Sequence, residues 1–273
     1  MITGGVGGCG VRTASDFGAI EGEKMKLIAR TIVAALALTT ILAPVAVGQT
    51  GPDANDHRRP SVVPASNVAG NSGGRLLGDW FVENLTLSKS ASPFGGSDNI
   101  CLDIGHRGKV LSPAGGILIP PENRVIEMTC PVEAGRPVVM VMTSADCSSA
   151  EPGPFFADTP RTQRTCALRN LSTIPVRSIN ISVDGSSPVD IHQRRFLEVS
   201  PQRSVVFPVD PVFQATPGPA TFVAAAWTAE IRGMKRGNHT VVATPIYELE
   251  DGPLVLPFIV HFQVVGGRGQ GGH

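Results

Sequence analysis

Aromatic side chains are scarce in this sequence. Its 273 residues include 11 Phe, two Trp and a single Tyr, which gives an aromatic fraction of 5%. Stacking surfaces for sugars are built from such large, flat rings. The composition therefore argues against a sugar-binding platform, whether on a binding module or on an enzyme.

Charge is also limited. Charged residues make up 17% of the chain, and 23 basic residues balance 23 acidic ones, so that the formal net charge is zero. No block of like charge marks a nucleic-acid footprint or a polybasic membrane patch. We therefore predict no nucleic-acid partner.

Motifs for several kinds of enzyme are missing. The sequence has no His-Glu-x-x-His and no Walker loop, the patterns of zinc proteases and of phosphate-binding loops. Paired carboxylates for glycoside hydrolysis can come from distant strands, so Glu83, Glu127 and Asp210 stay open as candidates. We predict no cofactor.

An export signal is present, and it begins late. The segment from Met25 to Arg30 carries two positive charges, and residues 32–47 form a nearly unbroken apolar run. The small-x-small sequence Ala46-Val47-Gly48 follows, which completes the layout of a secretory signal peptide over residues 25–48. We predict a secreted, periplasmic or cell-envelope protein. The alternative is a leader retained as an anchor, although Thr39, Thr40 and Pro44 interrupt the run and make it a poor membrane span.

The predicted domains follow from this leader. Residues 1–24 fit a start codon placed too early, which would remove Cys9 from the mature protein. Residues 49–76 are polar and rich in Pro, Asn, Ser and Gly, and we predict a flexible linker there. A β-sandwich domain is expected over residues 77–265, and the glycine-rich residues 266–273 are predicted to be a disordered tail.

The hydrophobic period between the linker and the tail is mostly two, which predicts strands. Short strands recur at about 10-residue spacing with turn signals between them, as in an antiparallel sandwich. The fold class is therefore mainly β, an Ig-like or jelly-roll-like antiparallel β-sandwich, with one short helix expected at residues 79–87 and capped by Asp79. The strands are expected at residues 138–142, 176–183, 196–199, 204–209, 222–231, 239–247 and 258–265.

Four cysteines follow the leader, an even number that indicates two disulfides in an exported chain. Three pairings are open. We expect Cys101–Cys130 and Cys147–Cys166 from sequence order, because the second bridge would close a Pro-rich loop over residues 148–165. The cysteines form no closely spaced pair and no cluster with histidine, so we predict no metal site.

The weak candidates for a polar site are Asp190, His192 and His239. Asp190 and His192 share one strand face by their spacing, which would suit a metal or an acid–base pair but suits an exposed polar face better. His239 lies in Gly-Asn-His-Thr, a turn that we expect to begin a strand and to pack back on the preceding loop. His106 is interpreted as a loop residue.

Several segments in sequence order resemble an uncharacterised family of exported bacterial proteins. They are the Trp80 segment, the stretch from Cys101 to Gly108, Cys130-Pro131-Val132-Glu133-Ala134-Gly135 with the strand after it, Val183-Asp184-Gly185, a Phe-x-x-x-x-Pro strand region, Trp227, and Gly237-Asn238-His239-Thr240-Val241. The resemblance covers residues 79 to 247. It departs from the pattern after Trp227, where Thr and Ala stand in place of bulkier apolar residues. It implies a secreted β-sandwich and no established activity.

Two functions remain in view. The first is a non-catalytic exported sandwich that binds an unknown envelope or extracellular ligand, with no stable transmembrane span after cleavage of the leader. The second is a secreted hydrolase that acts on cell-wall or environmental polymer.

Overall fold

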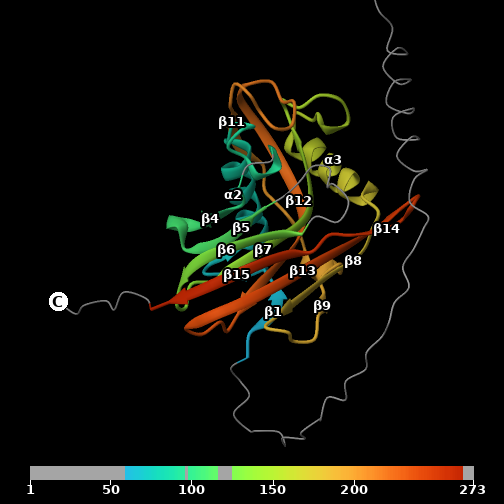
Figure 1. The fold of residues 1–273 in the computed structure, drawn as a ribbon. Coiled ribbons are helices and arrows are strands. Elements are labelled where there is room, and N and C mark those ends of the chain that lie inside the picture. The colour runs from blue at the N-terminus through green and yellow to red at the C-terminus, as the bar shows by residue number, and fades with distance from the viewer. Residues whose placement is uncertain (1–58, 96–97, 116–124, 267–273) are drawn as a thin grey trace, which may run out of the picture. The chain divides into compact units, whose positions relative to one another are not determined.

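A computed structural model describes residues 59–95, 98–115 and 125–266. The predicted early start (1–24), signal peptide (25–48), first part of the linker and residues 267–273 of the tail lie outside the described residues. Two sheets face each other in the part described (Figure 1).

The first sheet has seven strands and is built around two long ones, β12 and β7. Its main order is β1-β12-β7-β5-β4, and β10 and β11 also pair with β12. The bounds are β1 Ser61–Pro64, β4 Ile100–Ile104, β5 Val110–Ala114, β7 Val138–Ser148, β10 Leu197–Val199, β11 Arg203–Phe207 and β12 Gly218–Arg232.

The second sheet has six strands in the order β6-β15-β13-β8-β9, with β14 beside β13. The bounds are β6 Ile126–Glu133, β8 Val176–Val183, β9 Val189–Asp190, β13 Gly237–Leu249, β14 Gly252–Val255 and β15 Phe258–Val265. A small separate hairpin joins β2 Asn67–Val68 to β3 Asn71–Ser72.

The main core lies between the two sheets, where period-two alternation turns apolar side chains inward. On β15, Phe258, Val260, Phe262 and Val264 are buried, while His261 and Gln263 point outward. They meet alternate residues of β7 and β8, including Met140 and Ile181. The predicted strands are confirmed, and β15 is an interior strand, as its apolar pattern indicates.

Two α-helices cover the rest of the first sheet. Helix α2 (Gly73–Leu85) packs its buried face on the side away from the second sheet, and α3 (Pro160–Thr173) packs on Ala225 of the other side. The described residues also form four short 3-10 helices: η2 Pro93–Gly95, η3 His106–Gly108, η4 Gly153–Phe155 and η5 Arg194–Phe196.

Two sequence predictions about the N-terminal region are wrong. The linker does not extend to residue 76, because β1 pairs with β12 and α2 already begins at Gly73. The cap of this helix is Ser72, not Asp79, which instead forms an ion pair with Arg203. The glycines there allow close packing, because a Cβ at Gly74 would collide with the carbonyl oxygen of Val199.

Two further predictions need correction. The loop expected over residues 148–165 contains the first part of α3, which begins at Pro160. The sandwich is also not wholly antiparallel, since β6 pairs with β15 and β5 with β7 in parallel. Parallel pairing joins strands that are far apart in sequence, which local alternation cannot indicate.

Both predicted disulfides are confirmed. Cys101 on β4 is bonded to Cys130 on β6, with a Cα–Cα distance of 5.8 Å, so this bridge joins the two sheets. Cys147, near the end of β7, is bonded to Cys166 of α3, with a Cα–Cα distance of 5.9 Å. The second bridge fastens α3 to the first sheet.

Candidate functional site

Asp190 and His192 brace local backbone. The Asp190 Oδ1 atom accepts hydrogen bonds from the backbone N–H of Ile179 (3.1 Å) and of His192 (2.9 Å). The His192 ring lies 3.3 Å from the Arg177 carbonyl oxygen and packs edge-on against Trp227, with 4.5 Å between ring centroids. The carboxylate of Asp190 and the imidazole of His192 therefore both make contacts that stabilise the local fold.

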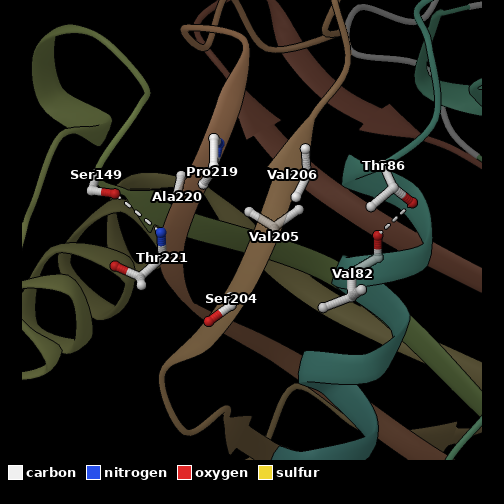
Figure 2. Close-up of a pocket in the computed structure, with 9 residues that line it drawn as sticks. All are labelled: Val82, Thr86, Ser149, Ser204, Val205, Val206, Pro219, Ala220 and Thr221. Carbon is white, nitrogen blue, oxygen red and sulfur yellow. Dashed lines mark hydrogen bonds between the residues drawn. The ribbon is translucent and has the colours of Figure 1, made fainter.

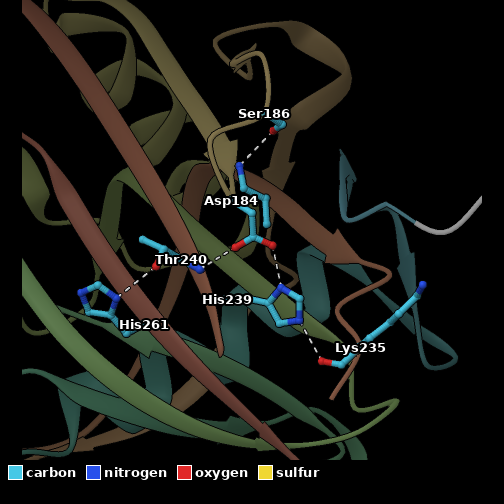
Figure 3. Close-up of polar contacts among 7 residues, drawn as sticks. Asp184, Ser186, Lys235, His239, Thr240 and His261 are labelled. Carbon is cyan, nitrogen blue, oxygen red and sulfur yellow. Dashed lines mark hydrogen bonds and ion pairs between the residues drawn. The ribbon is translucent and has the colours of Figure 1, made fainter. Parts of the chain in front are cut away.

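His239 also has a structural place (Figure 3). Its Nδ1 atom lies 2.6 Å from Asp184 Oδ2, and its Nε2 atom lies 2.8 Å from the Lys235 carbonyl oxygen. Asp184 Oδ1 also accepts the N–H of Thr240 at 2.8 Å. The histidine thus binds the loop before it, as the turn pattern predicts, and ties the turn after β8 to the start of β13.

A hydroxyl, an imidazole and a carboxylate follow one another across the outer face of the second sheet. Thr240 Oγ1 lies 3.2 Å from His261 Nδ1, and His261 Nε2 lies 2.8 Å from Glu127 Oε1. This is the order of groups in a nucleophilic triad. Catalysis would also need oxyanion donors and a cavity for substrate, and the two cavities described below are lined by other residues.

Ser72 fits a nucleophile motif that our sequence analysis missed. Residues 70–74 read Gly-Asn-Ser-Gly-Gly and lead into helix α2, the context of a nucleophile elbow. An elbow serine sits on a strained turn, whereas Ser72 has an ordinary φ of −69°. Its Oγ atom accepts a hydrogen bond from the Arg75 N–H at 3.3 Å. This serine caps α2.

An open groove of about 600 Å³ lies beside the edge strand β11 (Figure 2). Such a volume lies within the range of ligand-binding sites. Five of the nine lining residues are apolar and four carry hydroxyls, and none is ionisable. They come from α2 and its C-cap, from the residue after β7, and from β11 and β12: Val82, Thr86, Ser149, Ser204, Val205, Val206, Pro219, Ala220 and Thr221.

The groove has one fixed wall and one open edge. The Ser149 Oγ atom accepts the N–H of Thr221 at 3.0 Å, and the Ser149 N–H donates to the Thr221 carbonyl at 2.9 Å, which holds the wall. Among the described strands, β11 pairs only with β12. Val206 of this edge strand has 60% of its surface exposed. A second, smaller cavity of about 140 Å³ lies near Arg136 and Glu230.

Two carboxyl groups that flank Ser149 of the groove in sequence are buried. Asp146 on β7 is 7% exposed and Glu151 is 4% exposed, and within the described residues Asp146 Oδ2 and Glu151 Oε2 have no hydrogen-bond partner. Burial raises the pKa of Asp146 to about 7. Burial and then the charge of Asp146 raise the pKa of Glu151 to about 9. The pair therefore holds a proton at neutral pH, but its burial keeps it from a dissolved polymer.

Nothing in the sequence pattern indicates this pair or the groove. Both depend on contacts between segments far apart in the chain, and Asp146 lies within an apolar strand. His261 could have been assigned to an outer face from its period-two spacing, although not to a partner. Thr240 and Glu127 became its neighbours only through the strand order.

Neither a metal-binding cluster nor a membrane-spanning helix is found in the part of the chain that the structure describes. Residues 59–95, 98–115 and 125–266 hold no group of three His, Cys, Asp or Glu side chains placed to bind a metal ion. In the same ranges, no helix is long and apolar enough to cross a membrane. The absence of a cofactor stays a prediction.

Comparisons with known proteins add little. No protein-family model and no curated protein matches the chain. Among solved structures, the chain is similar to one described as the structure of PbICP-C in complex with falcipain-2. The two share 11% sequence identity with a TM-score of 0.25, over 57% of this chain and 99% of that chain. A likeness at that score carries no argument about fold or function.

Proposed function

We propose that this protein is an exported, non-catalytic β-sandwich that binds an uncharged, extended polypeptide segment in the groove beside β11. Two disulfides support export, because such bonds persist in oxidising compartments. The resemblance to exported bacterial proteins remains part of the same proposal.

The observation that carries this proposal is the chemistry of the groove. Its lining has no ionisable side chain, so a charged ligand would lose its hydration and gain no counter-charge. The hydroxyls of Thr86, Ser149 and Ser204 offer hydrogen bonds among the apolar contacts. An edge strand also presents backbone N–H and C=O groups that an added strand can pair with. A neutral segment in extended form satisfies both features.

Binding can be tested with an array of N-acetylated, C-amidated heptapeptides made only of uncharged residues. We expect a subset to bind, and Val206→Lys to weaken that binding at least about tenfold, since it places a charge at the edge strand. Val255→Lys is the matched control, because Val255 is 46% exposed and lies on the second sheet. Absence of any bound peptide, or equal loss in both variants, would refute the proposal.

One observation favours a hydrolase as the second candidate, namely the chain from Thr240 through His261 to Glu127. If it acts as a triad, Thr240→Val and His261→Gln should each abolish hydrolysis of p-nitrophenyl acetate. Equal rates in the wild type and both variants would remove this candidate. Neither substitution touches the groove, so the two tests are independent.

A further inference from the structure

The loop after β7 exposes two consecutive aromatic rings. Phe155 and Phe156 are 43% and 53% exposed, at the end of the 3-10 helix η4. Single exposed apolar residues are ordinary on protein surfaces. Two adjacent exposed phenylalanines at a loop tip form a small apolar patch. The residues around this tip indicate which partner the patch binds.

The tip is held firmly by its neighbours. The carbonyl oxygen of Pro154 accepts hydrogen bonds from Arg169 Nη2 (3.3 Å) and Asn170 Nδ2 (3.1 Å) of α3. The loop returns to β7 through a 2.9 Å hydrogen bond from the Ala157 N–H to the Ser148 carbonyl. The bridge from Cys147 to Cys166 closes the same loop. The rings are therefore presented on a preorganised support, which lowers the entropy lost on binding.

The helix against which the tip rests is basic. Arg161, Arg164 and Arg169 are all exposed, and α3 contains no acidic residue. Asp158 is the one acid between Gly153 and Thr173, so this stretch carries a net positive charge. The sequence as a whole has no block of like charge. Of these arginines, Arg169 contacts the loop through the Pro154 carbonyl oxygen, and Arg161 and Arg164 lie nearer the start of the same helix.

We propose that this tip and α3 together dock on an anionic lipid surface. The two rings would enter the interface between headgroups and acyl chains, while the exposed arginines of α3 face lipid phosphates. An anionic bilayer matches this arrangement, because its apolar acyl layer lies beneath a layer of negatively charged headgroups. This surface is separate from the peptide groove, and its function does not depend on the groove being occupied.

Sedimentation with vesicles tests the proposal. Protein recovered after export is mixed with vesicles of phosphatidylglycerol and phosphatidylcholine, or of phosphatidylcholine alone. We expect binding only to the anionic vesicles, with loss on raising NaCl from about 50 mM to about 500 mM. Phe155→Ser with Phe156→Ser, and separately Arg161→Glu with Arg164→Glu, should each lower the partition coefficient by at least about tenfold.

Matched variants separate this surface from general stickiness. Leu249→Ser with Val255→Ser removes two apolar groups that are 47% and 46% exposed on the second sheet, and Arg194→Glu with Arg195→Glu reverses two exposed charges elsewhere. The sequence before residue 59 is unchanged in every variant, so the part of it that remains after export contributes equally to each. Phe155→Trp should give a blue-shifted emission on anionic vesicles. Equal binding of the tip variants and the controls, or no binding of the wild type, overturns the proposal; the second result would leave an acidic protein surface as the partner to seek.

Discussion

Asp184 adopts a left-handed backbone conformation with a φ of 51°, and its two carboxylate oxygens serve different partners. One accepts the N–H of Thr240, and the other binds the ring of His239. Aspartate and asparagine tolerate this conformation better than most residues do, because their short side chains bond locally. A turn, a strand start and a histidine are thus all fixed by one side chain.

Replacement of this residue should separate its two contributions. We expect Asp184→Ala to lower the free energy of unfolding by about 2 kcal/mol, because it removes hydrogen bonds to a charged acceptor at a strained position. Asp184→Asn should cost clearly less, since it keeps the local conformation and one acceptor oxygen. Urea denaturation of the three proteins decides this, and equal midpoints would contradict the assigned role.

The buried pair of Asp146 and Glu151 makes stability depend on pH. Their pKa values are raised by burial to about 7 and about 9 in the folded state, above the ordinary values of 3.8 and 4.5. The folded protein therefore keeps protons that the unfolded chain releases. The stabilisation is fully present below about pH 4 and is lost progressively as the pH rises to about 9.

We expect Asp146→Asn to lessen this dependence and to raise the unfolding midpoint of the protein at about pH 8, because the buried charge of Asp146 then does not have to form. Midpoints measured in urea from about pH 5 to about pH 9 test the slope. A wild-type midpoint that rises over this interval would contradict the direction. Glu127→Gln, on the exposed outer face, is the control that should leave the slope unchanged.

At the scale of elements, strands could be predicted from the sequence and α3 could not. Strands such as β8 and β15 alternate regularly, and their buried residues are large and apolar. Helix α3 buries only Gln163, Cys166, Ala167 and Leu171, so it has almost no apolar period to detect. Its available signals were the capping box of Thr159 and Thr162 and the proline that begins it. These signals are short and are easily taken for a loop.

Because α3 buries few apolar side chains, the disulfide between β7 and α3 should make a large contribution to holding this helix on the sheet. It closes a separation of 19 residues, and the loss of such a bridge should cost about 3 kcal/mol. We expect Cys147→Ala with Cys166→Ala to lower the melting temperature and to make residues 148–159 the first site of proteolytic cleavage. The control, Cys101→Ala with Cys130→Ala, should cost a similar amount and leave that cleavage site protected. Identical cleavage patterns would show that the loop is held by its hydrogen bonds alone.

At the scale of the whole molecule, the sandwich class follows from strand spacing, but strand order does not. β6 meets β15 and β1 meets β12 across long stretches of chain, and no local pattern encodes those pairings. The groove and the carboxyl pair exist only once β7, β11 and β12 are adjacent, so they too escaped prediction. His239 could be placed correctly because its interactions begin with the turn in which it lies.

The predicted leader leads to an expectation about the first residue of the exported protein. We expect protein recovered outside the cytoplasm to begin at Gln49, or within a few residues of it, because a small-x-small site follows the apolar run. Intact-mass measurement reports the first residue directly. A recovered chain that still carries residues 1–24 would contradict both the cleavage site and the proposed start at Met25.

The parallel pairing of β6 with β15 constrains the order in which parts of this protein can fold. Ile126 pairs with Phe258, which a ribosome or a translocation pore releases much later than Ile126. Because so many pairings span long stretches of chain, folding should be slow and should finish late. Until folding is complete, the apolar strands stay exposed and can bind chaperones or aggregate. Such a chain suits a route that carries it across a membrane in unfolded form and lets it fold afterwards.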